Sequence, residues 1–255
     1  MPGLKDVKNK IEGVSKTSQI TKAMNMVASA KLRGAQERME KFRPYAEKFA
    51  EAMKDLSTGA GDNQPLMEVR DVESVELIVV TSDRGLCGSF NANIVGKAQK
   101  LINQFEAEGK KVSVVTVGNK AAQAFRRSGK IRESYTDLMG TFQMYNAREI
   151  SQNVSNHFCS YQVDEVRIVY ACFLSLAKQQ ATETTLLPIK PPEQKKEGEE
   201  GNSNSSAVDY IYEPAPDQIM DSLLPLHLNV QVYHAMIEVA AGEHAARMAA
   251  MDNET

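Results

Sequence analysis

The sequence predicts an α/β protein in which a small, mostly parallel α/β domain is inserted between two long terminal helices. Three observations predict this fold class. Apolar residues near both ends of the chain recur every three and four residues, which is the period of a helix. Short segments in the middle are rich in β-branched residues, and helical patterns alternate with them. We expect the terminal helices to pair as an antiparallel, left-handed coiled coil.

The first element, residues 1–58, has a heptad pattern that is long for an internal helix. It would span about 80 Å at a rise of about 1.5 Å per residue, so its apolar stripe needs a second long helix as partner. Pro44 lies inside the pattern, and we expect a bend there because the pattern resumes in phase afterwards. The predicted apolar seam consists of Leu4, Val7, Ile11, Val14, Leu32, Met39, Phe42, Phe49, Met53 and Leu56.

The stretch from 20 to 35 interrupts this seam with polar and small residues. Thr21 and Asn25 occupy seam positions there. Two interpretations fit the spacing equally well: polar residues that fix the register of a coiled coil, or a thin shaft passing through a surrounding collar. The first 35 residues also carry seven Lys or Arg against two acidic residues. This charge is typical of a solvated helix face, or of a segment that meets an acidic partner, nucleic acid or lipid head groups.

The middle of the chain, residues 74–189, predicts a Rossmann-like domain. The segments VELIVV (75–80), KVSVVTV (111–117) and VRIVYACF (166–173) resemble strands that are covered on both faces. Helical segments are expected at 92–108, 120–128 and 146–161.

Residues 190–208 have no periodicity and predict a flexible surface loop. The segment DYIYEPAP, which opens the last unit at 209–255, carries two tyrosines and two prolines and suggests an ordered turn. A second long helix follows, with its seam at Ile219, Leu223, Val230 and Ile237. We expect this helix to be the antiparallel mate of the first one.

The loop TSDRGLCGSFN (81–91) follows the first predicted strand and has two interpretations. A thiol-dependent enzyme would need a base and an orienting group near Cys87, and none is visible locally. A tight strand-to-helix turn, with Ser89 or Asn91 capping the next helix, is the favoured interpretation. Asp83 and Arg84 are expected to project from the strand end and contact another molecule.

The number of cysteines and the length of the longest apolar run further restrict the class of protein. Three cysteines, Cys87, Cys159 and Cys172, fall in different elements, which predicts neither disulfides nor a metal site and favours a reducing compartment. We expect no signal peptide and no membrane span, because no apolar run approaches about 18 residues.

Three long segments resemble the γ subunit of bacterial F-type ATP synthase. They are MPGLKDVKNKIEGVSKTSQITKAMNMVASAKLR, TSDRGLCGSFNANI, and YIYEPAP followed by LLPLHLNVQVYHAMIEVAAGEHAARMAAMDN. The resemblance covers essentially the whole chain. It implies a non-catalytic central rotor that couples proton flow through a ring of c subunits to conformational changes at catalytic β subunits. It also implies a peripheral place at the cytoplasmic face of the inner membrane.

The resemblance further implies partners and contact residues. The α and β subunits would form a ring around the shaft, and the ε subunit and c ring would meet its foot, with no nucleic acid, cofactor or metal involved. The residues that match the family's surface facing the catalytic subunits are Lys22, Met24, Lys31, Arg33, Asp83 and Arg84. The residues that match the foot are Tyr210, Tyr212 and Glu213.

The sequence departs from the family at its C-terminal end, because family chains continue beyond the MAAMDN motif and this one stops at Thr255. A mate ending there would leave the first 20 or so residues of the long helix unpaired. Two alternatives remain: a thiol-dependent α/β enzyme that dimerises through its helices, and a coiled-coil tether drawn to lipid by its basic end.

Overall fold

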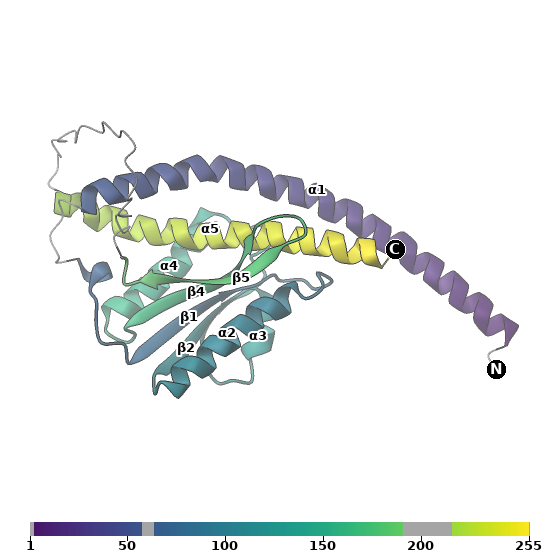
Figure 1. The fold of residues 1–255 in the computed structure, drawn as a ribbon, viewed down its shortest axis with the longest axis horizontal. Helices are drawn as coiled ribbons and strands as arrows, with labels where there is room; N and C mark the ends of the chain where they lie inside the picture. Colours follow the sequence, from purple (N-terminus) through teal and green to yellow (C-terminus); the bar gives the residue numbers. More distant parts are fainter. Residues whose placement is uncertain (1–2, 58–63, 191–215, 255) are drawn as a thin grey trace, which may run out of the picture.

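The computed structural model of the chain describes residues 3–57, 64–190 and 216–254. Figure 1 shows two long helices lying side by side and antiparallel along one side of a sheet, which confirms the predicted fold class. In chain order the elements are α1 (Leu4–Ser57), the short 3-10 helix η1 (Pro65–Met67), β1 (Ser74–Val80), α2 (Phe90–Ala107), β2 (Lys111–Val117), α3 (Asn119–Phe125), β3 (Ile131–Tyr135), α4 (Met144–Cys159), β4 (Glu165–Phe173), β5 (Gln179–Leu187) and α5 (Pro216–Asn253).

The sheet has the strand order β3-β2-β1-β4-β5. β1 lies at its centre between the parallel strands β2 and β4, β3 is parallel to β2, and β5 is antiparallel to β4. The segments predicted as strands are β1, β2 and β4, which is confirmed. β3 and β5 were not predicted, because both lie at sheet edges and their sequences IRESY and QQATETTLL are largely polar.

Helices cover both faces of the sheet. α2 and α3 follow β1 and β2 on one face, and α4 and α5 lie together on the other (Figure 1). α5 is therefore packed between α1 on its outer side and the α/β domain on its inner side, and a helix in that position must be apolar nearly all round. Its fully or nearly fully buried side chains include Met220, Leu224, Leu228, Val232, Met236 and Val239.

The seam between α1 and α5 is partly aliphatic and partly aromatic. Leu32 of α1 packs with Ala241 and Ala245 of α5, where small side chains let the two helices approach. Further along, the Phe49 ring stacks on His227 with ring centroids 5.9 Å apart. α1 continues through Pro44 without ending, as expected.

The burial of the remaining seam residues depends on whether α5 lies beside them. Met53, Val230 and Ile237 are buried. Those that are only partly buried are Met39, Phe42, Ile219 and Leu223. The side chain of Leu56 lies outside the described residues.

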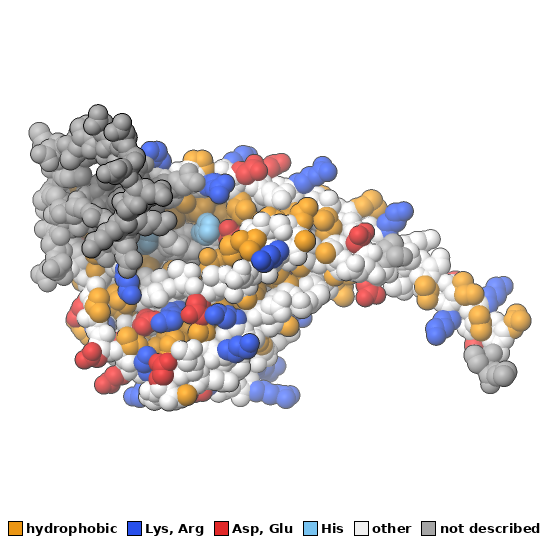
Figure 2. Space-filling view, in the orientation of Figure 1, with side chains coloured by type: hydrophobic (Ala, Val, Ile, Leu, Met, Phe, Trp, Pro, Cys, Tyr) orange, Lys and Arg blue, Asp and Glu red, His pale blue; other side chains and the backbone are white. Residues whose placement is uncertain are grey.

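The first part of α1 extends past the end of α5 without a partner among the described residues (Figure 1). Figure 2 shows hydrophobic and basic side chains exposed together on this projecting part. The exposed fractions are 90% for Leu4, 46% for Val7, 65% for Ile11 and 63% for Val14. The expectation that this end of the helix is unpaired is confirmed for the described part of the chain, in which Thr21 is the first residue of α1 to be buried.

One glycine sets how closely α5 approaches the α/β domain. A Cβ atom on Gly242 would lie 2.7 Å from the ring of Phe90, the first residue of α2. Real Cβ atoms do not come that close to a ring carbon, so glycine at this position allows the helix to rest against the aromatic ring.

Candidate interaction site at the carboxyl end of β1

The loop that follows β1 is fixed to the neighbouring strand β2 at its first residue. The Thr81 N–H donates to the Val117 carbonyl at 2.8 Å, and the Thr81 hydroxyl accepts from the Ala121 N–H at 2.8 Å. Gly118 makes this approach possible. Its φ is 93°, and a Cβ there would lie 2.3 Å from the Thr81 carbonyl oxygen.

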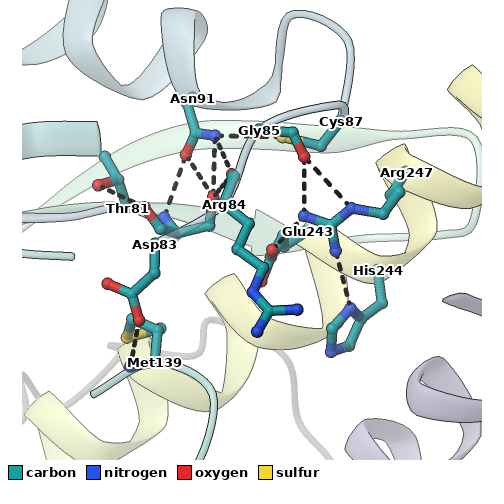
Figure 3. Close-up of polar contacts among 11 residues, drawn as sticks. Thr81, Asp83, Arg84, Gly85, Cys87, Asn91, Met139, Glu243, His244 and Arg247 are labelled. Atoms are coloured by element: carbon teal, nitrogen blue, oxygen red, sulfur yellow. Dashed lines mark hydrogen bonds and ion pairs between the residues drawn. The ribbon is translucent and has the colours of Figure 1, made fainter. Parts of the chain in front are cut away.

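A side-chain bridge closes the loop on itself. The Ser82 N–H donates to the Asn91 side-chain carbonyl at 3.1 Å, and the Asn91 amide nitrogen lies 2.9 Å from the Ser82 hydroxyl and 3.1 Å from the Cys87 sulfur (Figure 3). Asn91 therefore holds the loop and is not a helix cap. Ser89 stands at the N-cap position of α2, as predicted, but its side chain makes no capping hydrogen bond.

Asp83 anchors the loop to the rest of the domain. Its carboxylate accepts three backbone N–H groups, from Asn119 at 3.0 Å, Asp137 at 3.2 Å and Met139 at 2.8 Å. The partly buried Asp83 carboxylate thus faces donors of its own domain, and its contact with another molecule stays a prediction.

Arg84 differs from its neighbour because its side chain is exposed. Among the described residues its guanidinium makes no hydrogen bond or ion pair. The Arg84 carbonyl, by contrast, accepts from the Ser82 hydroxyl at 2.7 Å. Its backbone is thus held in place while its charge remains available for another molecule.

The helix α5 reaches the same loop with a buried arginine. Arg247 is 9% exposed, and its Nη2 and Nε donate to the Gly85 carbonyl at 3.0 and 3.3 Å (Figure 3). The same guanidinium pairs with Glu243 one turn earlier. Burial raises the pKa of the Glu243 carboxyl, while Arg247 opposes that shift.

Two residues of this group were not predicted as functional. Glu243 and Arg247 are spaced four apart in a part of α5 that is rich in alanine, and this spacing was the available signal, because such a pair shares one helix face. Their connection to the loop could not be read from the sequence, since Gly85 lies 162 positions away from Arg247.

The predicted contact residues of α1 lie along its surface. Lys22, Lys31 and Arg33 are exposed, and Met24 is partly buried. Lys31 is close enough to the buried group on α5 to lower the pKa of both Glu243 and His244, although burial outweighs it at Glu243. Lys31 thus lies on the side of α1 that faces Glu243 and His244. Tyr210, Tyr212 and Glu213 lie outside the described residues.

Cys87 lines a cavity of about 230 Å³ between the loop, the β4–β5 hairpin and the end of α5. None of the other described residues that line the cavity is a histidine, a carboxylate or a lysine. Cys87 is 2% exposed, and burial is the main cause that raises the pKa of its thiol. A neutral, buried thiol with no histidine, carboxylate or lysine in the lining of its cavity is a poor nucleophile, so the geometry does not favour the thiol-enzyme alternative.

Among the helices that the structure describes, none combines the length and the hydrophobicity that a membrane span requires. No group of three or more His, Cys, Asp or Glu side chains in residues 3–57, 64–190 and 216–254 is arranged to hold a metal ion.

Comparison with known proteins gives consistent matches. A family model described as ATP synthase matches residues 3–255. The ATP synthase gamma chain of Desulfotalea psychrophila is 57% identical over 256 residues, which cover 100% of this chain and 87% of the relative. The ATP synthase gamma chain of Nitratidesulfovibrio vulgaris strain Hildenborough is 50% identical over 258 residues, with the same coverage of 100% and 87%.

Solved structures show the same fold. The central stalk of the Tetrahymena thermophila mitochondrial ATP synthase matches with a TM-score of 0.68 and 24% identity, covering 92% of this chain and 98% of that one. The rotor of the Euglena gracilis mitochondrial ATP synthase matches with a TM-score of 0.62 and 24% identity, covering 96% and 88%.

Proposed function

The chain belongs to the ATP synthase gamma-chain family, and from this premise we propose how its surface couples rotation to catalysis. It is a central rotor subunit and carries no catalytic site of the complex itself. Our proposal is that Arg84 forms a charge-assisted contact with an acidic loop of a catalytic β subunit, in some rotational positions and not in others.

The observation that carries this proposal is the exposed guanidinium on a fixed backbone. Asp83 on one side and Gly85 on the other are each tied down by hydrogen bonds, while the charge of Arg84 has no partner among the described residues. An arginine pairs with a carboxylate through two parallel N–H donors, so a prepositioned guanidinium suits an acidic partner.

The coupling of rotation to catalysis follows from the different contacts that the rotor makes with each catalytic subunit. A rotor that touches all three catalytic subunits equally would bias none of them, whereas an asymmetric one stabilises a different conformation in each neighbour. We infer that Lys22, Met24, Lys31 and Arg33 on α1 face the same ring of α and β subunits. We infer that Tyr210, Tyr212 and Glu213 meet the ε subunit and the c ring, through which proton flow turns the rotor. The complex would then hold this subunit peripherally at the cytoplasmic face of the membrane.

The test is Arg84→Ala in the assembled complex. Single-molecule rotation should slow, or the distribution of its pauses should change, because one state-dependent contact is lost. The melting temperature of the isolated chain should hardly change, because an exposed charge contributes little to folding. Arg84→Lys should restore rotation only in part, since lysine keeps the charge but loses the planar pair of donors.

Arg126→Ala is the matched control, because Arg126 is also exposed but stands at the end of α3. It should leave rotation unchanged. If Arg84→Ala rotates like the unmodified complex while its melting temperature falls sharply, Arg84 supports the fold and the proposed contact is wrong.

A further inference from the structure

We propose that Arg247 of α5 is a positioning residue, which holds the loop of residues 82–89 so that Arg84 is presented to the neighbouring subunit. This inference rests on the proposed function of Arg84. It adds that the presentation of Arg84 depends on the shaft helix as well as on the α/β domain.

The first step is the pair of hydrogen bonds that Arg247 donates to one carbonyl. Two of its nitrogens donate to the Gly85 oxygen at 3.0 and 3.3 Å, and the guanidinium is itself held by Glu243 on the same helix. Because the planar fork is fixed by Glu243 and buried, it has little freedom to follow the carbonyl if the loop moves.

The second step concerns the backbone that this carbonyl belongs to. The Gly85 carbonyl and the Leu86 N–H share one peptide plane, and Leu86 has a φ of 61°. A leucine rarely adopts this left-handed conformation, so an outside restraint is needed to keep it there. The two hydrogen bonds from Arg247 fix that peptide plane.

The third step is the position of Arg84 between two anchors. Asp83 is bound to three N–H groups of the α/β domain, and Gly85 is bound to α5. The backbone of Arg84 cannot move independently of both. A shift of the shaft helix relative to the domain would therefore displace Arg84 directly, which makes the loop a mechanical link between the two parts.

The experiment is a double-mutant cycle in the assembled complex with Arg247→Lys and Arg84→Ala. Arg247→Lys keeps a cation beside Glu243, which favours folding, but it loses the fork that holds Gly85. We expect rotation to slow by about two- to tenfold, the range for the net contribution of one hydrogen bond, because both donors of the fork share the single Gly85 oxygen. If Arg247 acts through Arg84, the double variant should rotate as fast as Arg84→Ala alone.

Hydrogen exchange supplies a readout that does not depend on rotation. The Phe90 amide, which donates to the Cys87 carbonyl at 3.2 Å and so closes the same loop, should exchange faster in Arg247→Lys, whereas Arg84→Ala should leave it unchanged, because only the first variant releases the loop from α5. Arg126→Lys serves as the control for replacing an arginine outside the loop and should change neither measurement.

Two outcomes would overturn the inference while the proposed function stands. One is that Arg84→Ala slows rotation and Arg247→Lys has no effect on it. The other is that the two effects multiply in the double variant, which would mean that Arg247 acts independently of Arg84. If Arg84→Ala itself leaves rotation unchanged, both the proposed contact and this inference are wrong.

Discussion

At the scale of single residues, His244 shows how the packing of α5 controls protonation. Burial is the main cause that lowers its pKa to about 4 from an ordinary value of 6.5, and the nearby charges of Arg247 and Lys31 act in the same direction. Glu243, which faces the same group, shifts the other way because its carboxyl pKa is raised by burial. Burial therefore shifts the pKa values of two neighbouring side chains of one helix in opposite directions, down for His244 and up for Glu243.

The histidine leads to a pH prediction. Its folded pKa lies below its unfolded value, so the unfolded chain binds the proton more tightly and stability falls as the pH drops from about 6.5 toward 4. We expect the melting temperature of His244→Gln to fall less over this window than that of the unmodified chain. Above pH 7 the two should respond to pH alike. Parallel curves across the whole window would contradict the buried, neutral state of His244.

Asp83 shows which property of a single residue could not be predicted from the sequence. Its place after a buried strand was predictable from the pattern, and so was the exposure of Arg84 next to it. The direction of the Asp83 side chain was not, because its three N–H donors come from positions 36 to 56 residues further along the chain. Only the folded topology brings those donors to the end of β1.

At the scale of elements, the heptad seam of α1 contains paired and unpaired positions in one continuous helix. Phe49 is 8% exposed and packs against α5, whereas Ile11 is 65% exposed at the projecting end. The same substitution should therefore have very different effects at the two positions.

Phe49→Asp buries a charge without a partner and should lower the free energy of unfolding by about 3 kcal/mol or more. Ile11→Asp, its matched control, should change it by less than about 0.5 kcal/mol. Urea titrations of the isolated chain measure both. Equal losses would mean that the projecting end is packed in solution, and equal stability would mean that α1 does not pack on α5.

The elements also differ in how well the sequence specified them. β1, β2 and β4 were predictable because interior strands of a parallel sheet are apolar on both faces. β3 and β5 were not, because an edge strand has a neighbouring strand on one side only and can carry polar residues. In α5 the periodic pattern identified the seam toward α1. It did not identify the inner face, because a helix buried on two sides has no polar stripe to mark its orientation.

At the scale of the whole molecule, α5 belongs to two packing units at once. Most of the buried side chains of α5 join the same hydrophobic core as the central strand β1, and α1 packs on the outer side of α5. We expect the long helices and the α/β domain to unfold in one transition, since neither keeps its core without α5.

Met236→Ala tests this, because Met236 is fully buried on α5. It should lower the free energy of unfolding by about 2–5 kcal/mol, through lost contacts and a cavity. Circular dichroism of the helices and hydrogen exchange of the β1 amides should shift to the same denaturant concentration. Met26→Ala, at an exposed position of α1, should shift neither. Separate midpoints for the two signals would mean that the domain folds independently of the shaft.

The contact between Gly242 and Phe90 has a geometric consequence for a rotating body. The missing side chain lets the helix rest on the ring at the base of α2, and a methyl group there would force the two apart, since the ideal Cβ position is 2.7 Å from the ring. The close approach of α5 to the start of α2 therefore depends on the absence of a side chain at this position. We expect that a larger residue at this position would change the distance between the α/β domain and the shaft, and with it the mass distribution of the rotor.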